Sequence, residues 1–294
     1  MYLIIGGTGY LGSYCIKNIL EYTDNSIVAT YNNTKPHLEN KRIHWIKLDI
    51  SDFKQIDNFC EKFSKEKFKV IYLSAYHRPD KAEENPQIAW HINVACLDYF
   101  LNSFKNNIDI LYYSSTSYVY GKGIENYVFT EEDKCLPIET YGRTKLLAEQ
   151  LILLYGFNVA RYSLLIGPSI IERKHFFDII VDSLINNEKI EMFTDFYRTI
   201  TSFNQAAYYT IQLCEKYPDK KRNIINICTD EHLSKYDLAI KIYEKFNLKN
   251  KENIVPISIE GKNSILKTKR AKYNLVDNKK LKELLKIKHI NWEF

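Results

Sequence analysis

Tyr141 and Lys145 are the residues of this 294-residue chain whose types and spacing most directly suggest chemistry. The apolar pattern after them, over residues 146–152, predicts that both lie on one face of a helix, one turn apart. A tyrosine hydroxyl has an unperturbed pKa of about 10, so it is a poor acid or base near neutral pH. A fixed ammonium beside it favours the phenolate and brings it closer to useful proton transfer. Tyrosine and lysine are also common on helix surfaces, so this pair indicates a catalytic role only if the chain also binds a hydride carrier.

A glycine-rich loop near the N-terminus is the expected site for that carrier. Residues 2–5 form a short apolar run, typical of a buried parallel strand, and a helical pattern covers residues 10–22. Between them, glycines allow a tight turn and close backbone approach, and the helix N-terminus attracts a pyrophosphate. Strand, loop and helix in this order predict dinucleotide binding. The residues expected to contact the cofactor here are Gly6, Thr8, Gly9, Tyr10, Leu11 and Gly12.

The end of the second predicted strand, residues 26–30, bears on the choice of dinucleotide. An NAD site usually offers a carboxylate to the adenosine ribose at this point. This chain offers Tyr31 and Asn32, followed by Lys35, and no acid. We therefore favour NADP(H) as the cofactor and keep NAD(H) as the alternative, with Tyr31 and Asn32 as contacts.

Three further strands are predicted over residues 43–48, 70–73 and 108–113, with helices between them. This alternation predicts an α/β fold with a Rossmann-type, doubly wound parallel sheet, whose ligands bind at the carboxyl ends of the strands. Asp49 lies at one such end, although it could equally cap the helix predicted over 52–63. The residues expected at the cofactor from these strand ends are Asp49, Ile50, Ser74, Ala75 and Tyr76.

A hydroxyl cluster, residues 114–117, follows the strand at 108–113. Ligands of such sheets bind at this edge, although a simple Ser/Thr turn gives the same pattern. The loop from Thr116 to Tyr141 is long enough to return the helix of Tyr141 to the same strand end. The sequence thus allows Thr116 and Tyr141 to meet.

Beyond residue 167 the strict alternation stops, and helical patterns mix with short strands. We expect a smaller C-terminal lobe that binds substrate. The predicted division assigns residues 1–167 and about 203–228 to the dinucleotide-binding domain. It assigns residues of about 168–202 and 229–294 to the substrate lobe.

Bulk composition narrows the class of protein. The net charge is +5, with 45% hydrophobic and 26% charged residues, ordinary for a globular protein. The lysines of the C-terminal third suit a solvated face or a phosphorylated substrate, and are too dispersed to predict nucleic-acid binding. No C-x-x-C or H-x-x-x-H suggests a metal site. No apolar run nears the roughly 18 residues of a membrane span, so we expect a cytoplasmic protein with reduced thiols and no membrane partner.

Taken together, the motifs resemble those of the extended short-chain dehydrogenase/reductases. The resemblance rests on the glycine loop at 6–12, Thr116, and Tyr141 with Lys145, and it extends over most of the chain. Within that superfamily the chain is most similar to the dTDP-4-dehydrorhamnose reductases, through residues 75–93, 115–121, 141–149 and 233–239. The resemblance implies that Thr116, Tyr141 and Lys145 are catalytic. It also implies that the cofactor is bound by Tyr141 and Lys145, with Asn93 as a supporting residue.

The sequence departs from those reductases at residues 195–201, where they usually have a Gly-x-Pro-Thr stretch. Here the chain is more similar to the nucleotide-sugar epimerases and dehydratases. That similarity implies that Arg198 and Arg270 contact the nucleotide diphosphate. The residues implied or expected to bind substrate are His77, Ser117, Arg198 and Arg270.

Ser117 and Tyr118 follow Thr116 where nucleotide-sugar 4,6-dehydratases carry an Asp-Glu pair and GDP-fucose synthases use a cysteine. The resemblance therefore implies an NAD(P)H-dependent reductase of a nucleotide-linked 4-keto sugar, which makes activated sugars for surface polysaccharide. Two alternatives stay open. One is a nucleotide-sugar 4-epimerase with tightly bound NAD, and the other is a non-catalytic, dinucleotide-binding regulatory subunit. We also expect a homodimer built from helices over 86–104 and 141–154.

Overall fold

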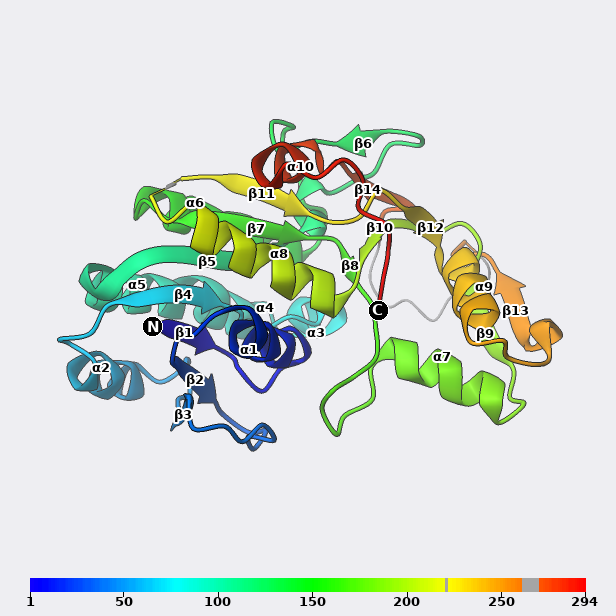
Figure 1. The fold of residues 1–294 in the computed structure, drawn as a ribbon. Helices are drawn as coiled ribbons and strands as arrows, with labels where there is room; N and C mark the ends of the chain where they lie inside the picture. Colours follow the sequence, from blue (N-terminus) through cyan, green and yellow to red (C-terminus); the bar gives the residue numbers. More distant parts are fainter. Residues whose placement is uncertain (220–221, 261–269) are drawn as a thin grey trace.

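A seven-stranded parallel sheet forms the larger of two lobes (Figure 1) in the computed structural model, which describes residues 1–219, 222–260 and 270–294. Its strand order is β11-β7-β5-β4-β1-β2-β3, and every neighbouring pair is parallel. The strands are β1 (Tyr2–Ile5), β2 (Ile27–Tyr31), β3 (Ile43–Lys47), β4 (Phe68–Tyr72), β5 (Ile108–Thr116), β7 (Asn158–Tyr162) and β11 (Ile224–Ile227). The chain winds one way from β1 to β3 and the other way from β4 onward. The predicted doubly wound fold is confirmed.

Helices cover both faces of this sheet, because every second side chain of a strand points to the opposite face. Tyr2 and Ile4 belong to a core with α1 (Tyr10–Tyr22) and α8 (Phe203–Lys216). Leu3 and Ile5 belong to the core on the other face. The helices of that face are α2 (Phe53–Lys62), α5 (Cys96–Phe104) and α6 (Thr140–Leu154). Burial on both faces explains why the strands are almost continuously apolar.

The smaller lobe has its own sheets and its own core. Its five-stranded sheet contains β6 (Val128–Phe129), β8 (Leu164–Leu165), β10 (Tyr197–Thr201), β12 (His232–Ser234) and β14 (Tyr273–Val276). A two-stranded sheet and two helices complete it: β9 (Ile190–Phe193), β13 (Ile254–Ile257), α7 (Phe176–Ile185) and α9 (Lys235–Lys245). Ile180 and Leu238 from the two helices share a buried cluster with Trp292. Several of these strands have only two to five residues, too few to show a periodic pattern in the sequence.

The C-terminal end of the chain packs against both lobes. The helix α10 (Lys279–Leu285) buries Leu281 and Leu285 in the core of the large sheet, and Ile290 joins them there. Trp292, two residues later, lies in the core of the smaller lobe. The end of the chain therefore connects the two cores.

The long helix expected over 86–104 is instead three consecutive segments, α4 (Pro86–Trp90), a π-helical turn (His91–Ala95) and α5. It is preceded by α3 (Pro79–Glu84), which ends before Pro86 because proline cannot continue an existing helix. The wider π-turn carries the buried Asn93. Such turns frequently occur at functional sites. Among the described residues, no helix has the length and apolar character needed to cross a bilayer.

A buried ion pair fixes α6 against the sheet. The carboxylate of Glu149 accepts from Arg161 on β7, with Nη2–Oε2 and Nε–Oε1 distances of 2.7 and 2.9 Å, and their side chains are 0% and 3% exposed. Ser115 on β5 donates to the same carboxylate at 2.5 Å. Arg161 also donates to Tyr120, whose hydroxyl donates to Asn226 on β11. Glu149 on α6 is thereby linked directly to β5 and β7, and through Arg161 and Tyr120 to β11.

This ion pair should be costly to break from one side. Replacing Arg161 with methionine leaves a buried, uncompensated carboxylate, so we expect the free energy of unfolding to fall by about 3–5 kcal/mol. Urea denaturation measures this change. Removing both charges with Glu149→Leu and Arg161→Met should cost less than Arg161→Met alone.

The exposed pair between Lys279 and Glu283 provides the control, with its charges 4.0 Å apart in solvent. Lys279→Met should change the free energy of unfolding by less than about 0.5 kcal/mol. If Arg161→Met destabilises the protein no more than Lys279→Met does, the buried pair does not hold α6 in place.

Candidate active site

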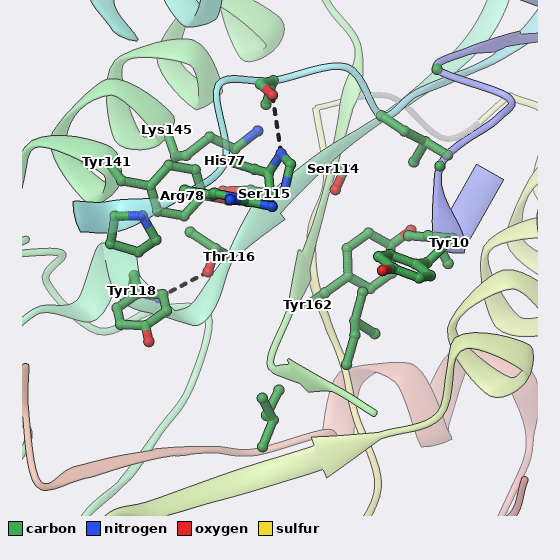
Figure 2. A pocket seen from close by; sticks show the side chains of 18 of the residues that line it. Tyr10, His77, Arg78, Ser114, Ser115, Thr116, Tyr118, Tyr141, Lys145 and Tyr162 are labelled. Atoms are coloured by element: carbon green, nitrogen blue, oxygen red, sulfur yellow. Dashed lines mark hydrogen bonds between the residues drawn. The ribbon is translucent and has the colours of Figure 1, made fainter. Parts of the chain in front are cut away.

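A cleft of about 780 Å³ opens at the carboxyl ends of β1, β4, β5 and β7 (Figure 2). This is the edge where the winding of the sheet reverses, between β1 and β4, and where doubly wound sheets bind their ligands. Both lobes contribute to its walls. The residues expected from the sequence that line it are Gly6, Gly9, Tyr10, Leu11, Gly12, Ala75, His77, Thr116, Tyr141, Lys145 and Arg270.

The glycine loop fits a dinucleotide pyrophosphate. Gly6 has a φ of +95°, a conformation that side chains disfavour, and a Cβ at Gly12 would lie 2.3 Å from the carbonyl oxygen of Gly6. Thr30 on β2 holds the loop by accepting from the amides of Gly6 and Gly7 at 2.9 and 2.8 Å. Gly9 begins α1 without any side-chain cap, so the first amides of the helix are left for a ligand in the cleft.

The expected adenosine end lies beyond the lining of this cleft, at the ends of β2 and β3. Ile50 is buried there, and Tyr31 packs edge-on against Trp45. Thr8, in the glycine loop, is also buried and does not line the cleft. Asn32 and Ser51 hydrogen-bond the carboxylate of Asp49. Burial opposes them, yet they hold the pKa of Asp49 below its usual value.

An acid therefore does stand beside the end of β2, although it comes from the neighbouring strand. Asp49 does not cap α2, because Asp52 accepts from the amides of Lys54 and Gln55 at 2.9 and 3.2 Å and fills that position. Sequence order hid this placement: Asp49 and Asn32 meet only through the pairing of β2 with β3.

The structure brings Tyr141 and Thr116 together (Figure 2). Tyr141 lies in the first turn of α6, whose N-cap, Glu139, accepts from the amide of Gly142 at 2.6 Å. Enclosure by the cleft walls is the largest influence and raises the pKa of Tyr141. The Glu139 carboxylate raises it further, and the hydrogen bond with Thr116 opposes them. At neutral pH the Tyr141 phenol thus keeps its proton, which suits a proton donor.

Lys145 is 1% exposed, one turn after Tyr141, with its Nζ 4.0 Å from the centre of the Tyr113 ring. Burial lowers the pKa of Lys145 to about 7, against the opposing influence of Glu149. The expectation that a fixed ammonium favours the phenolate is therefore not met here, because burial acts on both groups. It raises the pKa of the phenol and lowers the pKa of the amine.

Asn93 positions the loop after β4 rather than lining the cleft. Its side chain accepts from the Tyr76 amide at 2.7 Å and donates to the Tyr76 carbonyl at 3.2 Å and to Thr144 at 3.0 Å. This loop is thereby fixed to α6. Ser74, earlier in the loop, packs directly against Gly6.

His77 on the same loop faces Tyr141 and Lys145 across the cleft (Figure 2), with its Nδ1 3.4 Å from the Ala75 carbonyl. Desolvation, together with the charges of Arg78, Arg173 and Lys145, lowers the pKa of His77. The ring is therefore neutral near pH 7. A neutral imidazole in this position can exchange hydrogen bonds with a sugar hydroxyl.

Two of the four expected substrate contacts lie behind the cleft. The Arg198 guanidinium is 3% exposed and donates to the carbonyls of Tyr197, Ala271 and Lys272. Ser117 is also buried, and its carbonyl accepts from Asn274. Arg198 thus braces the segment that follows Arg270, instead of presenting its charge to a ligand.

Arg270 itself reaches the cleft and forms an ion pair with Asp80 at 2.7 Å, which joins the smaller lobe to α3. Sequence reasoning missed several further lining residues, most of which come from irregular loops or from the second lobe. They include Arg78, Tyr118, Tyr162, Arg173 and His175. The arginines among them make this wall suited to an anionic ligand.

Comparison with known proteins identifies relatives over most of the chain. The beta subunit of methionine adenosyltransferase 2 from Rattus norvegicus is 25% identical over 251 residues, covering 84% of this chain and 72% of that protein. A putative UDP-glucose 4-epimerase from Methanocaldococcus jannaschii is 29% identical over 217 residues, covering 66% of each.

Solved structures share the whole fold. A hypothetical dTDP-4-dehydrorhamnose reductase from Sulfolobus tokodaii has a TM-score of 0.80 and 25% identity, covering 100% of this chain and 98% of that one. The dTDP-4-dehydrorhamnose reductase of Bacillus anthracis, solved with NADP, has a TM-score of 0.80 and 20% identity, covering 99% and 94%. A family model described as the RmlD substrate binding domain matches residues 1–294. The chain therefore belongs to the RmlD substrate binding domain family, and the relationship to dTDP-4-dehydrorhamnose reductases expected from its motifs is confirmed.

Proposed function

We propose that this protein is an NAD(P)H-dependent reductase of a nucleotide-linked 4-keto sugar, with a 4-keto-6-deoxy sugar as the substrate class. The observation that carries the proposal is the convergence of Thr116, Tyr141 and Lys145 in one cleft with the glycine loop. A hydride source and a proton donor are both needed to reduce a carbonyl, and this cleft can hold both. The family match and the reductase names of two similar structures support the same reaction class.

The residues of the chain divide the work of the reaction. A bound nicotinamide supplies the hydride to C4 of the sugar. Thr116 hydrogen-bonds the C4 oxygen and orients it. Tyr141 donates its proton to that oxygen as negative charge develops there, and Lys145 stabilises the resulting phenolate and binds the nicotinamide ribose. The enclosed walls around Tyr141 and Lys145 limit the access of water, which strengthens these interactions.

The cofactor and substrate can be specified further. NADP(H) stays favoured because Tyr31 and Asn32 end β2, and the B. anthracis reductase was solved with NADP. NAD(H) is the alternative, because Asp49 places a carboxylate close to that strand end. Arg78 and Arg270 suit the diphosphate of a nucleotide sugar. We assign the reaction to the making of activated sugars for surface polysaccharide in the cytoplasm.

Two other functions are favoured by the names of relatives. One is a 4-epimerase, as a relative from M. jannaschii is named. Such an enzyme uses the same catalytic residues and keeps its cofactor, so denaturing the purified protein would release stoichiometric NAD(H).

The other is a regulatory subunit, as the first relatives are named, which would bind a methionine adenosyltransferase and reduce no sugar. Size-exclusion chromatography with such an enzyme tests this candidate. An intact Thr116, Tyr141 and Lys145 set favours catalysis over a purely regulatory role.

We also infer a homodimer through α4 and α6. Ile88, Trp90, Leu147 and Leu154 are exposed apolar side chains on these two helices. Trp90 and Leu147 line a second cavity of about 640 Å³ on this face. A surface of this kind is costly to leave in water. Sedimentation velocity of the wild-type chain should give a dimer and that of Leu147→Glu a monomer; a wild-type monomer would contradict this inference.

Removing the Tyr141 hydroxyl should abolish most turnover. We expect Tyr141→Phe to lower kcat for reduction of dTDP- or UDP-linked 4-keto-6-deoxy sugars by about 10²–10⁴-fold, with little change in NADPH affinity. Stopped-flow measurement of the loss of absorbance by the reduced nicotinamide gives the rate of NADPH oxidation. Tyr22→Phe, which removes the same group at the half-exposed end of α1, is the control. Undiminished turnover by Tyr141→Phe would remove Tyr141 from the mechanism.

The lowered pKa of Lys145 predicts a pH dependence. Because burial lowers the pKa of Lys145 to about 7, the ammonium loses its proton as pH rises through neutrality. The free enzyme then lacks the cation that stabilises the phenolate, so kcat/KM should decline as pH rises from about 6 to about 8. Lys145→Arg keeps its charge over this range and should be slower but free of that decline. Identical pH profiles for the two proteins would assign the decline to another group.

A further inference from the structure

Tyr10 connects the glycine loop to the smaller lobe. Its hydroxyl donates to the carbonyl oxygen of Lys174 at 2.8 Å and accepts from Nε of Arg173 at 2.9 Å. The Arg173 guanidinium also lies over the Tyr10 ring, 4.6 Å from its centre. One residue in the first turn of α1 therefore orients the loop that precedes α7.

The same loop is held at two further points. Tyr14, one turn along α1, donates to the carbonyl of Pro168 at 3.0 Å. His175 packs edge-on against both Tyr10 and Phe203, with ring centres 4.9 and 4.8 Å apart. The position of the loop relative to the N-terminus of α1 is thus set by side-chain packing and not by a single contact.

Arg173 brings a positive charge to this junction. Over residues 1–219, 222–260 and 270–294, no carboxylate lies within ion-pair distance of its guanidinium. The side chain lines the cleft together with Gly9, Leu11 and Gly12. Its charge also lowers the pKa of His77, another residue that lines the cleft, so the positive potential of Arg173 extends into the cleft. Lys174, the next residue, forms an ion pair with Asp182 at 2.7 Å and does not line the cleft.

We propose that Arg173 is a cofactor-binding residue that clamps the diphosphate of the dinucleotide from the smaller lobe, opposite the amides of the glycine loop. The proposal rests on the dinucleotide site of the proposed function. An arginine donates several hydrogen bonds in a plane and pairs well with phosphate oxygens. Contact with Tyr10 holds this donor ready beside the loop before any ligand arrives. Binding of the cofactor would then draw the two lobes together at the mouth of the cleft.

The position of Arg173 favours the cofactor diphosphate over that of a nucleotide sugar. Its partner Tyr10 belongs to the glycine loop and lies across the cleft from Tyr141 and Lys145 (Figure 2). Arg270, in contrast, is braced through its neighbours by Arg198 and pairs with a residue of α3. Two arginines thus stand at different parts of the cleft, and each can serve a different diphosphate.

Equilibrium titrations with NADPH test the clamp. We expect Arg173→Gln to raise the Kd for NADPH by roughly 10- to 100-fold, the value of one or two charge-assisted hydrogen bonds. Because Arg173 is solvent-accessible, the difference from wild type should shrink as ionic strength rises. Lys174→Gln removes the same charge one residue away and should change the Kd by less than about twofold. Thermal unfolding of each variant checks that the fold is intact.

Titrations with dTDP and UDP separate the two sources of diphosphate. The proposal expects their affinities to be unchanged in Arg173→Gln. Loss of dTDP or UDP affinity with unchanged NADPH affinity overturns it and assigns Arg173 to the substrate. Wild-type NADPH affinity in Arg173→Gln overturns the clamp alone. A wild-type protein that binds neither NADPH nor NADH overturns the clamp and the proposed reductase together, whereas a clamp effect without sugar reduction contradicts only the reductase.

Discussion

The site depends on a helix that carries its polar residues on its buried face. Tyr141, Lys145 and Glu149 follow one another at intervals of one turn along α6. Lys145 and Glu149 are buried, and Tyr141 is partly buried and lines the cleft. Burying a carboxylate in this way is strongly unfavourable unless it is paired, and Arg161 and Ser115 provide the partners. Since a helix is rigid at about 6 Å per turn of four residues, fixing Glu149 against β5 and β7 also fixes the other two side chains. The ion pair therefore sets where the proton donor stands, although it lies outside the cleft itself.

Burial then determines the protonation of the two catalytic groups. An ammonium close to a phenol would by itself favour the phenolate. In this cleft, desolvation outweighs the pairwise charges, so Tyr141 holds its proton firmly and Lys145 holds its proton loosely. The cleft thus starts the reaction with a protonated phenol, and negative charge on Tyr141 becomes favourable only after its proton has moved to the substrate. This order is the one that carbonyl reduction requires.

Local sequence was sufficient for the parts of this site that depend on local structure. The loop from Gly6 to Gly12 and the spacing of Tyr141 and Lys145 are properties of single elements, and the pattern of apolar residues predicted the sheet that brings them together. Partners joined by distant pairing could not be predicted. Asp49 reaches Asn32 through the alignment of β2 with β3. The guanidinium of Arg198 donates to the carbonyls of Ala271 and Lys272, 73 and 74 residues away in the chain. The sequence of a short strand does not show whether a charged side chain on it contacts a ligand or hydrogen-bonds to backbone carbonyls of the same protein.

The two lobes are joined differently at the back and at the front of the cleft. Behind it, Ile290 and Trp292 anchor one continuous segment in both hydrophobic cores, a connection that cannot open without exposing apolar surface. In front, polar contacts join the lobes beside the aromatic packing of His175 against Tyr10 and Phe203. These polar contacts are the Arg270–Asp80 pair and the hydrogen bonds of Tyr10 with the loop before α7. Polar contacts at a solvent-exposed edge contribute little net stability, because water can replace them. The front edge is therefore the part of the molecule where the charges of a bound ligand can most readily change the distance between the lobes. The apolar connection at the back fixes their relative position.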